Sequence, residues 1–397
     1  MPTDTTIILL ASPSLLDLEV TISRLGTEST GGSAFATPQR FDNFDTVDPV
    51  FLGLADAAPT LRRLSIAGRQ GPGPELITPL LHLTHLRELY VYNQSCSLSP
   101  LTIRELFGKL TALEVLFARI VDFTGSIHSR VAAYAPHLRD LRIQGTSEDL
   151  RGMLRPGFLD LPQLAGLSMR ASESEYSPHS ADIFALIASA GFARSLRRLT
   201  VYLINDTAEA LRLNSFNDAA SFASTIRPLF ALKDLEIVDV YLGNSLYPFT
   251  DEDVLEIARA WKDVRGLHLS YPPFLSYPPL TALRHFSEHC PVLEDLSMTK
   301  VSVPETLDVP PAIAGSTAHP LRSLDLKMTF GQVGTRLEKA LIAQYIDHYF
   351  PSLILCEPQV TEPLVLPAHA KFRLPSDMFN WGAIEQEIRL LRTQRSR

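Results

Sequence analysis

The residues of this chain best suited to metal chemistry are two histidines in one predicted helix. His285 and His289 lie four residues apart, so their imidazoles fall on one face of a helix and could chelate a metal ion. Glu288 is the one carboxylate beside them, and Cys290 leads into the corner before the next strand. We favour a structural role for both histidines and a buried, unreactive thiol at Cys290, and we predict no metal site.

Several common catalytic motifs are absent from the sequence. It contains no G-x-S-x-G, no H-E-x-x-H and no Gly-rich phosphate loop of either common type. The carboxylates Asp251 and Asp253 fit charges at the start of a helix better than an acid–base pair. We therefore predict neither catalytic residues nor a bound cofactor, and we do not expect an enzyme.

Composition and charge exclude further classes of function. The 397 residues carry a formal net charge of −8, which provides no general attraction for phosphate backbones. No stretch approaches the roughly 20 apolar residues of a membrane span, and no secretory signal is recognisable. Cys96, Cys290 and Cys356 are too far apart for a disulfide framework. We expect a cytoplasmic or nuclear protein that binds neither nucleic acid nor membrane.

A leucine-based repeat runs along the chain and must position any functional side chain. Apolar residues recur at positions 1, 4 and 6 of a short frame, and between Leu61 and Leu353 the copies begin 25 to 36 residues apart. The mean of about 29 lies at the long end for leucine-rich repeats, in which a strand is followed by a helix. A single repeat cannot bury its apolar face, so the repeats must stack. The frames begin at Leu15, Leu61, Leu86, Leu113, Leu138, Leu164, Leu196, Leu232, Val264, Leu293, Leu321 and Leu353.

The segments between the frames predict helices, because their apolar residues lie three and four apart. These helices are expected at 102–110, 182–190, 250–261, 280–289 and 335–350, with Thr250 as the N-cap of the third. We predict a solenoid over residues 1–370, with an irregular loop at 26–50 and a Pro/Ala-rich loop at 302–320. A capping helix and basic tail are expected at 371–397.

These repeats resemble the leucine-rich-repeat region of F-box proteins, particularly the large fungal sets with repeats like those of ribonuclease inhibitor. The resemblance covers roughly residues 50–357 and is carried by AYAPHLRDLRI at 133–143, ARAWKDVRGLHLS at 258–270, SEHCPVLEDLSM at 287–298 and HYFPSLILCE at 348–357. It implies target recognition within a cullin-type ubiquitin ligase. The F-box itself, a three-helix module that docks a Skp-type adaptor, is not recognisable before Leu15 or within 26–50, so we do not expect adaptor binding from these residues.

Strand alternation identifies the side chains that face outward from the concave sheet. If frame positions 4 and 6 enter the core, positions 3, 5 and 7 lie on the surface. Tyr and Arg are enriched in interface hot spots, although such residues also form ordinary cross-strand pairs. The candidate partner-binding residues are Arg63, Tyr90, Tyr92, Phe117, Arg119, Arg142, Arg170, Arg198 and Tyr202, and the expected acidic positions of the second half are Asp234, Glu236, Asp295 and Asp325.

We therefore predict an α/β leucine-rich-repeat solenoid, a horseshoe of about eleven or twelve repeats with a parallel concave sheet and helices on the convex side. Its expected role is that of a monomeric, non-catalytic module that binds a protein partner on the concave face. Alternatives are a stand-alone repeat scaffold or a GTPase-activating-type regulator, for which Arg119 or Arg142 would enter the partner's nucleotide site. A small-molecule pocket on the concave face is a third possibility.

Overall fold

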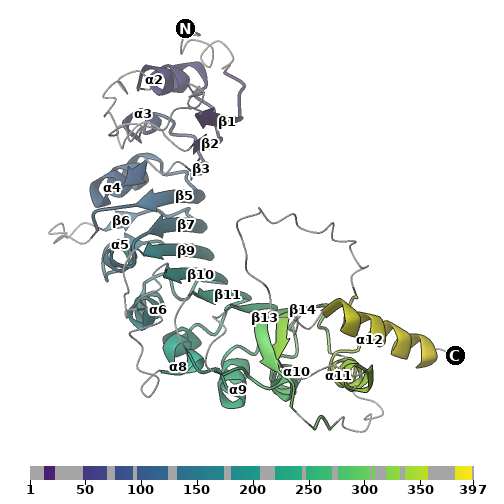
Figure 1. The fold of residues 1–397 in the computed structure, drawn as a ribbon. Coiled ribbons are helices and arrows are strands. Elements are labelled where there is room, and N and C mark those ends of the chain that lie inside the picture. The colour runs from purple at the N-terminus through teal and green to yellow at the C-terminus, as the bar shows by residue number, and fades with distance from the viewer. Residues whose placement is uncertain are drawn as a thin grey trace, which may run out of the picture. The chain divides into compact units, whose positions relative to one another are not determined.

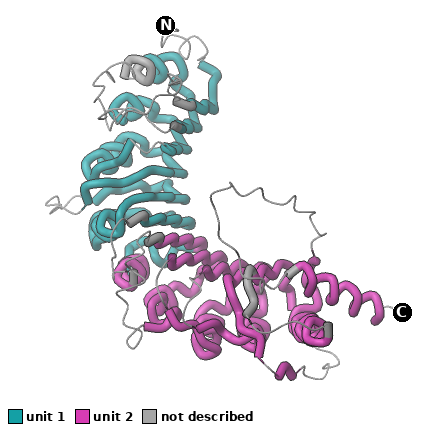
Figure 2. Tube along the Cα trace, in the orientation of Figure 1, with its two compact units in different colours: residues 1–172, 189–196 teal, residues 173–188, 197–397 magenta. Residues whose placement is uncertain are grey.

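The computed structural model describes residues 13–22, 48–68, 77–92, 96–123, 132–173, 180–205, 220–243, 247–270, 276–304, 306–308, 319–330, 336–355 and 381–395. The chain forms two compact units, which Figure 2 shows in different colours. Unit 1 comprises residues 1–172 and 189–196, and unit 2 comprises residues 173–188 and 197–397.

Unit 1 is built on a parallel sheet whose neighbouring strands follow chain order. These strands are β1 (Asp17–Ile22), β2 (Arg63–Gly68), β3 (Glu88–Val91), β5 (Val115–Ile120), β7 (Asp140–Gly145) and β9 (Gly166–Glu173). The short β4 (Ser97–Leu98) also pairs with β5, and β6 (Ala133–Tyr134) pairs with β8 (Leu159–Asp160) in a separate ribbon. The helices are α2 (Asp48–Ala57), α3 (Ile77–Leu80), α4 (Pro100–Lys109) and α5 (Ser147–Met153), and Figure 1 shows α4 and α5 on the same side of β5 and β7.

Unit 2 repeats the same plan with another parallel set of strands. It contains β10 (Arg198–Asn205), β11 (Ile237–Leu242), β12 (Gly266–Ser270), β13 (Asp295–Ser302) and β14 (Ser323–Phe330), each paired with the next. The helical segments are α6 (Ser180–Ser189), α8 (Phe222–Ile226) with the 3-10 turn η2 (Arg227–Ala231), α9 (Asp251–Ala260), η3 (Leu280–Ala282) with α10 (Leu283–His289), α11 (Arg336–Tyr349) and α12 (Trp381–Arg395).

The predicted leucine ladder exists in each unit, because residues at the same frame position are paired across neighbouring strands. In unit 1 the register joins Leu64, Leu89, Leu116, Leu141 and Leu167. In unit 2 it joins Leu199, Val238, Leu267, Leu296 and Leu324. These side chains are buried, and their apolar surface supplies the driving force for stacking one repeat on the next. The prediction of an α/β leucine-rich-repeat solenoid is confirmed.

The predicted frame at Leu232 was wrong by three residues. In β11, Val238 and Val240 pair with Leu199 and Val201 and are fully buried, whereas Ile237 is 40% exposed. The strand frame therefore begins at Leu235 rather than at Leu232. The error arose because Leu232, Leu235 and Val238 are spaced by three, so the apolar pattern fits a frame that begins at Leu232 or at Leu235. Only the pairing of β11 with β10 and β12 shows which of these frames places its apolar residues in the core.

A buried aspartate ties a helix to the preceding repeat in each unit. Asp149 caps α5 with Thr146 and also accepts the backbone N–H of Phe123, at 3.0 Å, through its Oδ1. Asp253 completes a capping box with Thr250, the predicted N-cap of α9, and accepts the Ser221 hydroxyl at 2.6 Å. Each carboxylate satisfies helix donors and a donor about one repeat earlier in the chain.

The last helix docks on α11 through a buried carboxylate. Asp347 is nearly inaccessible and forms ion pairs of 2.7 Å with Arg392 and 2.6 Å with Arg395. Ile384 and Ile388 of α12 are fully buried. At the degenerate frame that begins at Leu353, the Ile354 N–H donates to the Arg322 carbonyl at 2.8 Å. This hydrogen bond continues the pairing between successive repeats.

The other local predictions differ from the structure mainly at their boundaries. The predicted helices at 102–110, 182–190, 250–261 and 335–350 correspond to α4, α6, α9 and α11, and the one at 280–289 begins with a 3-10 turn. The helix α2 begins within the predicted loop 26–50, while residues 23–47 lie outside the described ones, as do 305 and 309–318 of the predicted loop 302–320. The division at residue 370 stays a prediction. Within the described ranges, no helix combines the length and apolar character needed to cross a bilayer.

Candidate protein-binding surface

The outward face of the unit 1 sheet presents an aromatic cluster, which we define as Tyr90, Tyr92 and Phe117. Tyr90 is paired in register with Phe117 of the next strand, and Tyr92 follows two residues later on the same face. The Tyr90 and Tyr92 rings are stacked with centroids 6.0 Å apart, and the Tyr92 and Phe117 centroids lie 4.5 Å apart. Tyr92 remains 48% exposed despite these contacts. The three rings therefore form a continuous apolar surface that solvent can reach.

Charged groups fix the edge of the aromatic cluster. The Arg63 guanidinium carbon lies 5.2 Å from the centre of the Tyr90 ring, and Arg63 pairs with Glu88 on the neighbouring strand at 3.5 Å. The Tyr90 hydroxyl donates to Glu88 at 3.1 Å. Burial raises the pKa of Tyr90, and the hydrogen bond to Glu88 acts in the same direction. Tyr90 therefore stays a neutral hydroxyl at the rim of the cluster.

The remaining predicted arginines of unit 1 also lie on this face. Arg142 is paired in register with Phe117 and donates to Asp140 of its own strand at 2.9 Å, which raises the pKa of its guanidinium. Arg119 and Arg170 both lie opposite Gln144 of β7. Arg142 and Arg170 are exposed, and Arg119 is half-buried. Arg63 thus forms the cross-strand ion pair considered in the sequence analysis, with Glu88 on the neighbouring strand. Arg142 instead pairs with Asp140 on its own strand.

In unit 2 the predicted Tyr202 contacts two outward-facing residues that the sequence did not identify. Arg198 is exposed, and Tyr202 donates its hydroxyl to Asp239 at 2.6 Å. The Tyr202 ring centre lies 5.9 Å from that of Tyr241. Asp239 and Tyr241 were missed because the frame that begins at Leu232 does not place them at outward positions of the strand. The signal that could have found them is the alternation of Leu235, Val238 and Val240.

Acidic residues lie on the outward face of the unit 2 strands, but they are only partly the predicted ones. Asp239, Asp295 and Asp325 lie on the outward face of the unit 2 strands, and His268 contacts Asp295 at 3.1 Å. Asp234 and Glu236 instead belong to the turn before β11, where Asp234 pairs with Arg197 at 3.3 Å. The outward sheet residues of unit 2 are thus more acidic than those around the aromatic cluster.

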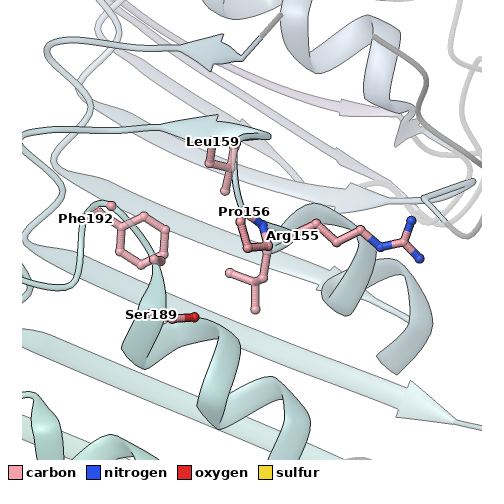
Figure 3. A pocket seen from close by; sticks show the side chains of 9 residues that line it. Arg155, Pro156, Leu159, Ser189 and Phe192 are labelled. Atoms are coloured by element: carbon pink, nitrogen blue, oxygen red, sulfur yellow. The ribbon is translucent and has the colours of Figure 1, made fainter. Parts of the chain in front are cut away.

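The cavity shown in Figure 3 is too small for a metabolite-sized ligand. It has a volume of about 190 Å³ and lies at the turns after α5 and α6, away from the outward sheet residues. Phe192, Pro156 and Leu159 contribute to its wall, whereas the Arg155 side chain extends away from it (Figure 3). Ligand pockets usually occupy about 300–1,000 Å³. This cavity therefore provides no support for a cofactor or substrate site.

Comparisons with known proteins identify no family. No protein-family model and no curated protein sequence matches this chain. Among solved structures it is similar to an internalin from Listeria monocytogenes, with 17% identity, a TM-score of 0.35 and coverage of 61% of this chain and 55% of that chain. A Bacteroides fragilis protein shows 16% identity, a TM-score of 0.37 and coverage of 60% and 66%. The yeast Rad7 and Elc1 complex contains a chain with 14% identity, a TM-score of 0.40 and coverage of 84% and 77%.

Proposed function

We propose that this chain is a non-catalytic protein-binding module that holds a partner on the outward face of its strands. The observation that carries the proposal is the aromatic cluster, in which Tyr92 is 48% exposed although it contacts two other rings. Large aromatic side chains in an ordered surface patch are the residues that dominate interface energies. They lose little rotamer freedom on binding, because neighbouring rings and strand pairing already hold them.

The charged residues around the cluster support recognition of a peptide segment of mixed character. Arg63 and Arg142 are each held by an acid, so their guanidinium groups are oriented before a partner arrives. A partner side chain packed on Tyr92 and Phe117 would have hydrogen-bonding groups of Arg63, Glu88 and Arg142 at its border. This is the arrangement of an apolar centre with a polar rim that stable interfaces use.

We further propose that the bound partner is a target of a cullin-type ubiquitin ligase. This finer role rests on the resemblance of the repeats at 133–143 and 287–298 to those of F-box proteins. A cytoplasmic or nuclear location fits the free thiols of Cys96 and Cys290, which are buried in the repeat core. Ubiquitination of the isolated partner by a cullin-type ligase that requires this chain would support the ligase role, and ubiquitination that is unchanged without this chain would contradict it.

The test uses matched exposed tyrosines of unit 1. A photo-reactive phenylalanine analogue is placed at position 92 or at position 134, where Tyr134 is 52% exposed on the separate β6–β8 ribbon. We expect a cross-linked protein from position 92 and none from position 134. Once the partner is isolated, Tyr92→Ala and Phe117→Ala should each weaken binding at least tenfold, and Tyr134→Ala should leave it unchanged. Equal cross-linking from both positions, or full affinity in both cluster variants, would refute the proposed surface.

A further inference from the structure

The helix α10 in unit 2 brings together three side chains with metal-binding atoms. His285, Glu288 and His289 each offer one ligand atom, and these atoms all lie within 4.8 Å of one another. The three residues occupy a single turn, because positions i, i+3 and i+4 share one face of a helix. Two imidazoles and one carboxylate form a donor set that binds zinc in proteins.

The structure adds to this cluster a feature that the sequence does not show. His285 is buried, with 6% of its side chain exposed, and its Nε2 lies 3.0 Å from Asp251 Oδ2 on α9. Its Nδ1 is buried and has no hydrogen-bond partner among the residues that the structure describes. Buried polar atoms almost always have a partner, so an orphaned ring nitrogen requires an explanation.

The contact with Asp251 determines which nitrogen of His285 can act as a ligand. A carboxylate accepts a proton donor, so Nε2 carries the hydrogen, and the tautomer that binds a metal keeps its lone pair on Nδ1. The two nitrogens of an imidazole point in widely divergent directions, and Nδ1 therefore faces away from Asp251. A carboxylate that orients a histidine through its other nitrogen is the usual support of a metal-bound imidazole.

We propose that His285, Glu288 and His289 form a zinc site, with Nδ1 of His285 as the buried ligand and Asp251 as its supporting carboxylate. Glu288 is exposed and His289 half-buried, so an ion can enter from solvent and keep water as a further ligand. Bonds of about 2 Å require ligand atoms roughly 3.4 Å apart, so the proposal requires the accessible side chains of Glu288 and His289 to rotate to this spacing when the ion binds. The structure is thus consistent with an ion seated at the C-terminal turn of α10.

The site would also connect neighbouring repeats. Asp251 belongs to α9, and Ser287 of α10 donates to the Tyr349 carbonyl of α11 at 3.4 Å. An ion on α10 would hold His285 in its contact with α9, and it should therefore stabilise the packing of these helices. Binding of the ion to the folded state alone would raise the thermal midpoint of unfolding.

The experiment uses the full chain without a histidine tag, stripped with EDTA and titrated with Co²⁺ and then with competing Zn²⁺. We expect one equivalent of Co²⁺ with the visible absorption of a tetrahedral site, displaced by Zn²⁺. His289→Ala and Asp251→Asn should each weaken Co²⁺ binding at least tenfold, and both should remove the rise in thermal midpoint with Zn²⁺. The matched control His137→Ala replaces an exposed histidine of unit 1 and should change neither result.

Three results would overturn the site. One is the absence of Co²⁺ absorption at millimolar metal, and another is an unchanged affinity in His289→Ala. The third is equal weakening in His137→Ala, which would show scattered surface binding. His285→Asn is measured as well. Because His285 is buried, this variant also changes folding, so the decision rests on the accessible His289 and on Asp251, which supports His285 and is not a proposed ligand.

Discussion

Replacement of the two buried capping aspartates should destabilise the chain by different amounts. Asp149→Ala keeps Thr146 as the N-cap of α5 but removes the acceptor of the Thr146 donors, a loss of about 1 kcal/mol. It also leaves the buried N–H of Phe123 without an acceptor, which costs a further 1–3 kcal/mol or so. We therefore expect a decrease of about 2–4 kcal/mol in the free energy of unfolding.

Asp253→Ala provides the matched comparison in unit 2. It removes an equivalent capping box, but the donor left behind is the hydroxyl of the half-buried Ser221, which can rotate toward another acceptor or water. The expected cost is about 1 kcal/mol. Asp149→Asn should also cost about 1 kcal/mol, because the amide oxygen can still accept from Phe123 while the contacts to Thr146 are disturbed.

Hydrogen exchange measured by mass spectrometry provides the assay, because it reports each repeat separately. The peptide that contains Phe123 should lose protection by at least tenfold in Asp149→Ala and by much less in Asp149→Asn. Urea unfolding gives the global cost of each variant. An Asp149→Ala variant that is no less stable than Asp253→Ala would refute the argument that the backbone donor makes the difference.

Two further predictions concern buried contacts in each unit. Gly152→Ala would place a Cβ against the Phe123 carbonyl oxygen, so the helix α5 must shift, and thermal melting should show a large loss of stability. The control Gly108→Ala should be tolerated, because the added Cβ would meet no atom of the described residues within 4 Å. Burial lowers the pKa of His319, whose Nδ1 accepts the Leu321 N–H at 3.2 Å. Between the lowered pKa of folded His319 and the ordinary value of 6.5, the unfolded state binds more protons than the folded state. The contribution of His319 to the free energy of unfolding should therefore be complete above pH 6.5 and fall as the pH drops through that interval. If His319→Gln does not flatten the dependence of the unfolding free energy on pH, this assignment is wrong.

The repeat class and much of the candidate surface could be predicted because they follow from local periodicity. Leu64 and Leu89 alternate with Arg63, Ser65 and Tyr90, and the period of a strand places these two sets on opposite faces. The same reasoning placed Tyr92 on the surface. Thr250 and Asp253 were recognisable as a cap because both residues lie within one turn.

The contacts within the surface could not be predicted, since they depend on register between strands. Phe117 is paired with Tyr90, yet its ring lies nearest to Tyr92, a diagonal contact that aromatic side chains on neighbouring strands can reach. Tyr241 was lost through the three-residue ambiguity of its repeat, which local pattern does not resolve.

The sequence by itself determined that strands and helices alternate in a stacked solenoid, because hydrophobic spacing is a property of neighbouring residues. Only the tertiary structure decided which groups meet across repeats. Asp251 approaches His285 from 34 residues earlier, and Asp149 reaches the Phe123 amide 26 residues earlier. Such partnerships depend on the packing of one repeat against the next, and no pattern within a single repeat encodes them.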